Sequence, residues 1–171
     1  MSGSAAQLYE GDFVRWTEQQ SRALREAAGV GTNLPLDWEN LAEEIESLGR
    51  SQRHELRSRI AVILEHLLKL EHSPANDPRR GWMETIARER LEIELLLNDS
   101  PSLKGGVARM IAETSSRVAQ LTTHVLRLYG EDVGNLTPPT YTEDQVLGDW
   151  LPGDAPHPSP LPAGGEREGP A

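Results

Sequence analysis

The sequence of 171 residues has no cysteine, which excludes disulfides and thiolate zinc sites. Its first residues contain neither an apolar run nor a basic flank, so we expect no signal peptide and no membrane anchor, and we predict a cytoplasmic protein. Basic residues are also scarce. There are 17 Lys and Arg against 27 Asp and Glu, and the net charge of −10 argues against nucleic-acid binding.

Strand-like alternation of apolar and polar residues is missing throughout the chain, whereas apolar residues recur at helical steps of three and four. The pattern predicts an all-α fold, a helical bundle of about four main helices followed by a short C-terminal helix. The predicted helices span residues 6–28, 38–72, 79–98, 107–128 and 142–147. We expect residues 1–152 to form one domain and the Pro- and Gly-rich residues 153–171 to be a disordered tail.

The longest predicted helix carries the clearest pattern. Asp37 is a good N-cap, and Gly49 in the middle of the pattern favours one kinked helix. A single polar residue, Gln52, interrupts an apolar stripe that predicts burial along the whole helix. The stripe consists of Leu41, Ile45, Leu48, Leu56, Ile60, Ile63, Leu67 and Leu70.

Several segments resemble the bacterial domain-of-unknown-function family 29. They are YEGDFVRWTEQQSRALR, LDWENLAEEIESLGRSQRHELRSRI, ILEHLLK, GWMETIARER, NDSPSL and the closing YTEDQVLGDWLP. The resemblance covers residues 9–152 and implies a helical bacterial domain, but it implies no reaction. Gly105 and Gly106 depart from the helix-forming residues expected after NDSPSL.

A group of glutamates precedes Gly49. Glu39, Glu43 and Glu46 share one helix face at steps of four and three, and Glu44 lies beside them. Like charges at this spacing repel one another unless they are solvated, paired with arginines or bridged by a cation. The sequence leaves three interpretations open: a solvated face, ion pairs, or a site for Mg²⁺ or Mn²⁺, which prefer oxygen ligands.

A group of basic residues follows Gly49. They form a predicted binding face for an anion or an acidic partner. The alternatives are a solvated face or ion pairs for the arginines and ordinary packing for the histidine. The face comprises Arg50, Arg53, Arg57, Arg59, His66 and, further along the chain, Arg90.

Arg90 falls on the apolar stripe of its own predicted helix, where it must be paired if it is buried. We therefore predict an internal charged cluster. It would join Arg90 to one or more of Asp12, Glu43, Glu44 and Glu46.

No Gly-rich phosphate loop, nucleophile elbow or HExxH motif is present. The leading hypothesis is a helical domain that binds another protein through residues 39–59 and needs no cofactor. Exposed apolar residues of the 107–128 helix could provide a homodimer seam. The alternative is a metal-dependent enzyme acting on a phosphorylated small molecule or a nucleic acid, with the glutamates as ligands.

Overall fold

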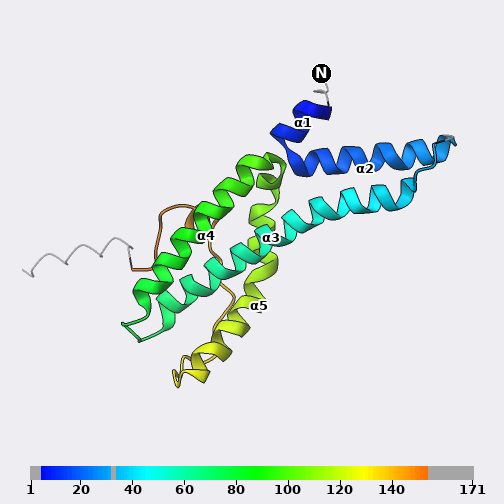
Figure 1. Cartoon of the computed structure of the whole chain (residues 1–171). Coiled ribbons are helices and arrows are strands. Elements are labelled where there is room, and N and C mark those ends of the chain that lie inside the picture. The colour runs from blue at the N-terminus through cyan, green and yellow to red at the C-terminus, as the bar shows by residue number, and fades with distance from the viewer. Residues whose placement is uncertain (1–4, 32–33, 154–171) are drawn as a thin grey trace, which may run out of the picture.

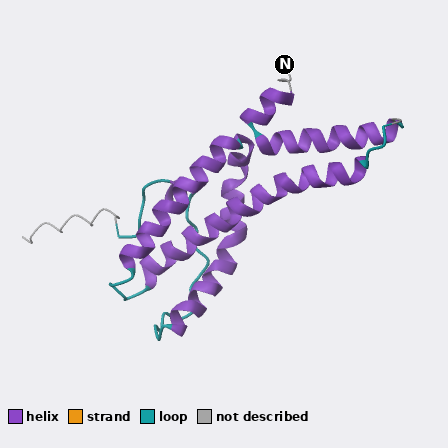
Figure 2. Ribbon diagram, in the orientation of Figure 1, coloured by secondary structure: helices purple, strands orange, loops and turns teal. Residues whose placement is uncertain are grey.

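The structure is a computed structural model that describes residues 5–31 and 34–153. This part of the chain contains helices and loops and no strand, which confirms the all-α prediction (Figure 2). Apart from Gly153, the predicted tail lies outside the described residues. The elements are α1 (Ala5–Gly11), α2 (Phe13–Val30), α3 (Trp38–His72), α4 (Arg79–Asp99), the 3-10 helix η1 (Pro101–Gly106), α5 (Val107–Leu128) and α6 (Glu143–Leu147).

The longest helix, α3, organises the molecule. Its C-terminal half packs against α4 and α5, and its N-terminal half packs against α2, which returns beside it as a hairpin (Figure 1). We call α2 together with residues 38–52 of α3 the arm, because this pair projects from the remaining helices. The rest of the described chain is the body.

Local capping signals set the ends of these helices. Asp12 ends the expected first helix early, because its Oδ1 accepts the Arg15 amide and starts α2 there instead. Gly31 closes α2 in the left-handed conformation, with φ of 70°. Asp37 caps α3 as predicted, and Thr142 caps α6 with a complete capping box.

The hydrophobic core lies in the body. From Leu56 onward the apolar stripe of α3 is buried as predicted, against residues of α4, α5 and α6 such as Ile93, Val107 and Val146. The stripe N-terminal to Gln52 behaves differently. Leu41 is 40% exposed and Leu48 is 47% exposed, so the prediction of burial along the whole helix is wrong for the arm, where α2 covers a different face.

Small residues allow α2 and α3 to approach closely. Ala42 and Gly49 of α3 are buried against α2, which contributes Thr17 and Ser21 to the contact. A Cβ atom on Gly49 would lie 2.4 Å from the Thr17 Oγ1 atom. Gly49 is thus required by this helix contact, and α3 continues through it as one helix.

Candidate functional site

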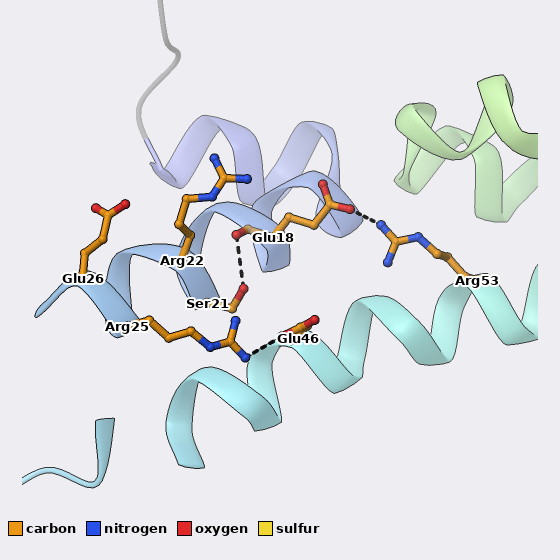
Figure 3. A pocket seen from close by; sticks show the side chains of 7 residues that line it. All are labelled: Glu18, Ser21, Arg22, Arg25, Glu26, Glu46 and Arg53. Carbon is orange, nitrogen blue, oxygen red and sulfur yellow. Dashed lines mark hydrogen bonds and ion pairs between the residues drawn. The ribbon is translucent and has the colours of Figure 1, made fainter. Parts of the chain in front are cut away.

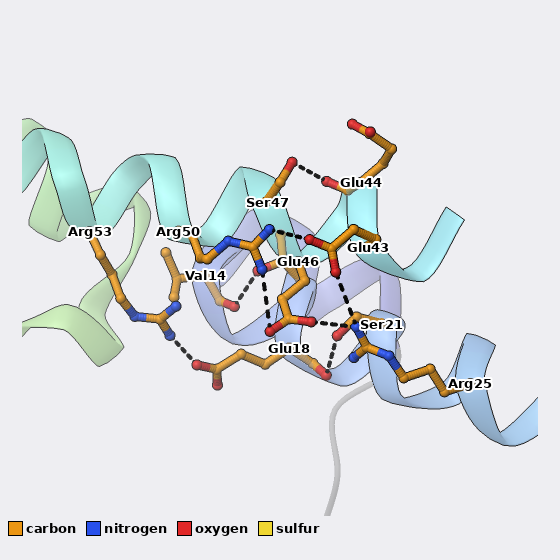
Figure 4. Close-up of polar contacts among 11 residues, drawn as sticks. Val14, Glu18, Ser21, Arg25, Glu43, Glu44, Glu46, Ser47, Arg50 and Arg53 are labelled. Atoms are coloured by element: carbon orange, nitrogen blue, oxygen red, sulfur yellow. Dashed lines mark hydrogen bonds and ion pairs between the residues drawn. The ribbon is translucent and has the colours of Figure 1, made fainter. Parts of the chain in front are cut away.

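The arm has a charged side, formed by Glu18, Arg22, Arg25, Glu26, Glu43, Glu46 and Arg50, and Arg53 at the base of the arm extends it. Its centre is a network of ion pairs between the two helices (Figure 4). Arg25 Nη2 of α2 lies 2.6 Å from Glu46 Oε2, and Arg50 Nη2 lies 2.6 Å from Glu43 Oε1. The hydrogen bond from Arg25 lowers the pKa of the Glu46 carboxyl group. Of the three interpretations of the glutamates, ion pairing describes Glu43 and Glu46.

An open groove of about 640 Å³ lies along this side (Figure 3). Its charges balance, because Arg22, Arg25 and Arg53 face Glu18, Glu26 and Glu46. Arg53 also donates a hydrogen bond to Glu18 across the two helices. The groove consequently offers an approaching anion little net positive charge.

The two other glutamates of the predicted metal set lie at the edge of this network, where Glu39 still interacts electrostatically with Arg25. Glu44 points away from the arginines in Figure 4, and Glu39 lies in the first turn of α3. Within residues 5–31 and 34–153, no group of three or more His, Asp or Glu side chains is placed to hold a metal ion. A cation bound by Glu43 and Glu46 would have to displace Arg25 and Arg50, so the metal site and the enzyme built on it stay predictions.

We expect the melting temperature to be the same in millimolar Mg²⁺ or Mn²⁺ as in EDTA. An ion that bound only the folded chain would raise the melting temperature, because at one hundred times its Kd it would add about 2.7 kcal/mol to the free energy of unfolding. Differential scanning fluorimetry checks this expectation, with Na⁺ at matched ionic strength as the control. A rise with the divalent ion that disappears in Glu43→Gln would support the metal-site alternative.

Arg57 and Arg59 of the predicted binding face also have acidic partners. Arg57 lies 3.5 Å from Glu113 of α5, which joins α3 to α5. Arg59 hydrogen-bonds Glu55 and also Glu89 of α4, and these bonds raise the pKa of the guanidinium group. These contacts hold helices of the body together.

His66 lies next to the core of the body. Its Nδ1 atom is 2.8 Å from the Val62 carbonyl oxygen of the preceding turn. The imidazole is half-buried, so this contact satisfies one of its polar atoms within α3. The observation matches the packed histidine that the sequence left open as an alternative.

Arg90 is half-buried as expected, but its predicted carboxylate partners are wrong. Its Nε atom donates to the Val146 carbonyl at 2.9 Å, and its Nη2 atom donates to the carbonyls of Gln145 and Trp150 at 2.9 and 2.8 Å. Burial lowers the pKa of the guanidinium group. Arg90 thus holds the C-terminal segment on α4 and takes no part in a cluster with the glutamates of the arm.

Sequence reasoning missed a polar junction at the base of the arm. The fully buried Ser100 donates through Oγ to Gln52 Oε1 at 2.6 Å and accepts the Val14 amide at 3.3 Å. Asp12 also accepts both the amide and the hydroxyl of Ser102. The polar gap at Gln52 was the available signal, because a polar residue on a buried stripe requires a partner.

The opposite flank of the arm is apolar. We call it the apolar side, and it consists of Phe13, Trp16, Gln20 and Leu24 of α2 with Leu41, Ile45 and Leu48 of α3. At 100° per residue these positions lie on one flank of each helix, across the interhelical contact from the ion pairs. Since the charged flanks of α2 and α3 meet, their apolar flanks lie together too.

The apolar side is separate from the core of the body. Val14 is the residue that α2 contributes to the buried core cluster in the described part of the chain. Trp16 instead stacks with Phe13 at a ring-centre distance of 5.7 Å, and Tyr9 of α1 packs edge-on against both rings. Tyr9 of α1 thus covers part of this side, while Leu41 and Leu48 of α3 remain exposed on it.

The fold and these two surfaces define an all-helical domain with a projecting, two-sided hairpin. The chain belongs to the family described as domain of unknown function DUF29, whose family model matches residues 8–151. A similar solved structure is the crystal structure of an alpha-helical protein of unknown function from Rhodospirillum rubrum, with a TM-score of 0.68. The two chains are 24% identical over 82% of this chain and 89% of that chain, so the likeness shows the fold alone. No curated protein matches the sequence.

Across the described ranges of the chain, none of the helices combines the length and apolar character needed to cross a membrane.

Proposed function

We propose that this protein is a helical protein-binding module that uses the apolar side of its arm. The observation that carries the proposal is the exposure of Leu41 and Leu48 in line with Ile45, on a helix whose apolar stripe is buried from Leu56 onward. Apolar surface gathered on one flank of a projecting hairpin is a typical protein contact area.

The charged side of the arm is less suited to bind a partner than the apolar side, because its charges already pair within the chain. Its ion pairs from Arg25 to Glu46 and from Arg53 to Glu18 connect α2 to α3 within the chain, and its charges balance. Exposed pairs of this kind contribute little to stability. They fix the alignment of the two helices, and so keep the apolar residues of both on one flank.

The double variant Leu41→Glu/Leu48→Glu is expected to lose at least 90% of partner binding while keeping its helix content. In an apolar contact of this kind, the two introduced carboxylates would be buried without compensating charges, which is energetically costly. The matched control is Arg22→Glu, which changes an exposed residue on the charged side. The readout is affinity capture from an extract of the source organism, followed by measurement of Kd with the purified partner.

A captured protein counts only when the purified pair binds with the wild-type chain and the control variant but not with the double variant. Equal capture by all three chains would overturn the proposal, provided that circular dichroism shows them folded.

A further inference from the structure

The charges of α2 are confined to one strip of the helix. Arg15, Glu18, Arg22, Arg25 and Glu26 fall within an arc of about 100° at the helical repeat. Roughly 260° of the surface is therefore free of charge. Val14, Thr17 and Ser21 on this surface are buried, whereas Phe13, Trp16, Gln20 and Leu24 are partly exposed. The chain as a whole has a net charge of −10, so this uncharged face is distinct from the rest of its surface, and an uncharged partner surface would complement it.

The order of residues on this face is nearly symmetric about Gln20. A two-fold axis perpendicular to the helix pairs positions whose numbers sum to 40. Large residues then meet smaller ones, with Trp16 opposite Leu24 and Phe13 opposite Ala27 of the other copy. Gln20 lies opposite Gln20 of the other copy, and the two side-chain amides can hydrogen-bond each other because an amide both donates and accepts. An isologous contact of this kind is the commonest way for two copies of one chain to associate.

From this pattern we infer that the partner is a second copy of the chain, which pairs its α2 antiparallel to the first across a two-fold axis at Gln20. The inference rests on the proposed function, since it names the occupant of the same apolar side. Leu41 and Leu48 of α3 flank the contact, so that the two arms form a four-helix arrangement. The polar Gln20 pair at the centre fixes the register of the helices, as a single buried amide does in coiled coils.

The area suffices for a reversible dimer. A helix of 18 residues is about 27 Å long, and two helices side by side are roughly 20 Å wide, which gives a face on the order of 500 Å² per copy. This value lies at the low end of specific interfaces. Because no ion pair is needed across the contact and the copies repel one another through their net charge, added salt should strengthen the association.

A cysteine cross-link tests the axis directly, because the 171 residues include no other thiol. Across helices packed 8–10 Å apart, facing Cα atoms come within about 3.5–5.5 Å, which overlaps the range of Cα separations in disulfides. We expect Gln20→Cys, oxidised with copper phenanthroline in air, to become a covalent dimer in more than half of the chains. Arg22→Cys, on the charged side of the same turn, should cross-link at least tenfold less.

Light scattering at about 100 µM should give a mass near twice 18.9 kDa for the wild type and near 18.9 kDa for Trp16→Glu. A wild-type monomer at this concentration overturns the inferred dimer. The proposed protein-binding function would then still be tested by the capture assay described above. A dimer whose Gln20→Cys variant does not cross-link also overturns the inference, because another face, such as Leu121 and Leu128 of α5, must then form it. Should Trp16→Glu unfold, Leu24→Glu replaces it.

Discussion

Replacing Arg90 with leucine is expected to lower the free energy of unfolding by about 3 kcal/mol. The guanidinium group donates three hydrogen bonds to the carbonyls of residues 145, 146 and 150, and leucine leaves all three acceptors unpaired. The lost contacts lie 55 to 60 residues away in the chain, so the C-terminal segment should detach from α4 before the core opens. Urea unfolding measures the first effect, and hydrogen exchange of the α6 amides measures the second.

Two variants separate this effect from a change of charge. Arg88→Leu removes an exposed arginine two positions away on the same helix and should change stability by less than about 0.5 kcal/mol. Arg90→Lys keeps the positive charge but lacks the planar fork, so it should recover only part of the loss. Unchanged exchange of the α6 amides in Arg90→Leu would show that apolar packing of residues such as Val146 and Trp150 alone holds the segment.

The second large effect is expected at the helix contact in the arm. Gly49→Val should destabilise the chain by about 3 kcal/mol, because its Cβ atom would stand 2.4 Å from Thr17 Oγ1 and its methyl groups would need further space. The threonine cannot turn away freely, since its hydroxyl group donates to the Val14 carbonyl at 2.7 Å. Urea unfolding and hydrogen exchange of the α2 amides measure the loss.

Alanine gives the sharper comparison. Gly49→Ala should destabilise the wild type, whereas in a Thr17→Ala background it should stabilise by up to about 1 kcal/mol, the gain in helix propensity. Gly81→Ala is the control without a clash, because nothing lies within 4 Å of its added Cβ atom. If Gly49→Ala stabilises both backgrounds equally, the close approach of Thr17 does not restrict position 49.

Helix ends could be predicted because their signals are local. Asp37 and Thr142 cap the residues that follow them directly, and Gly31 ends a helix within its own turn. Asp12 was the exception. It lies inside a periodic apolar pattern that favours one helix, but its carboxylate also binds Ser102, 90 positions away, and this contact fixes it at a helix start.

The candidate site required information that periodicity does not contain. Leu41 and Leu56 belong to one stripe with the same chemical character, yet one is 40% exposed and the other is fully buried. Spacing places residues on a face, but the neighbours that cover that face come from the arrangement of distant helices. For the same reason Arg90 could be predicted to need a partner, while its backbone acceptors could not be named.

The unbroken course of α3 has a mechanical consequence. One helix of 35 residues, about 52 Å long, belongs to both the arm and the body, so no joint separates them. Gly49, where a bend would otherwise be easiest, is enclosed by Thr17. The helix therefore acts as a rigid spacer that holds a partner bound at the tip of the arm about 20 Å from the core. A rotation of the tip would rotate the body with it.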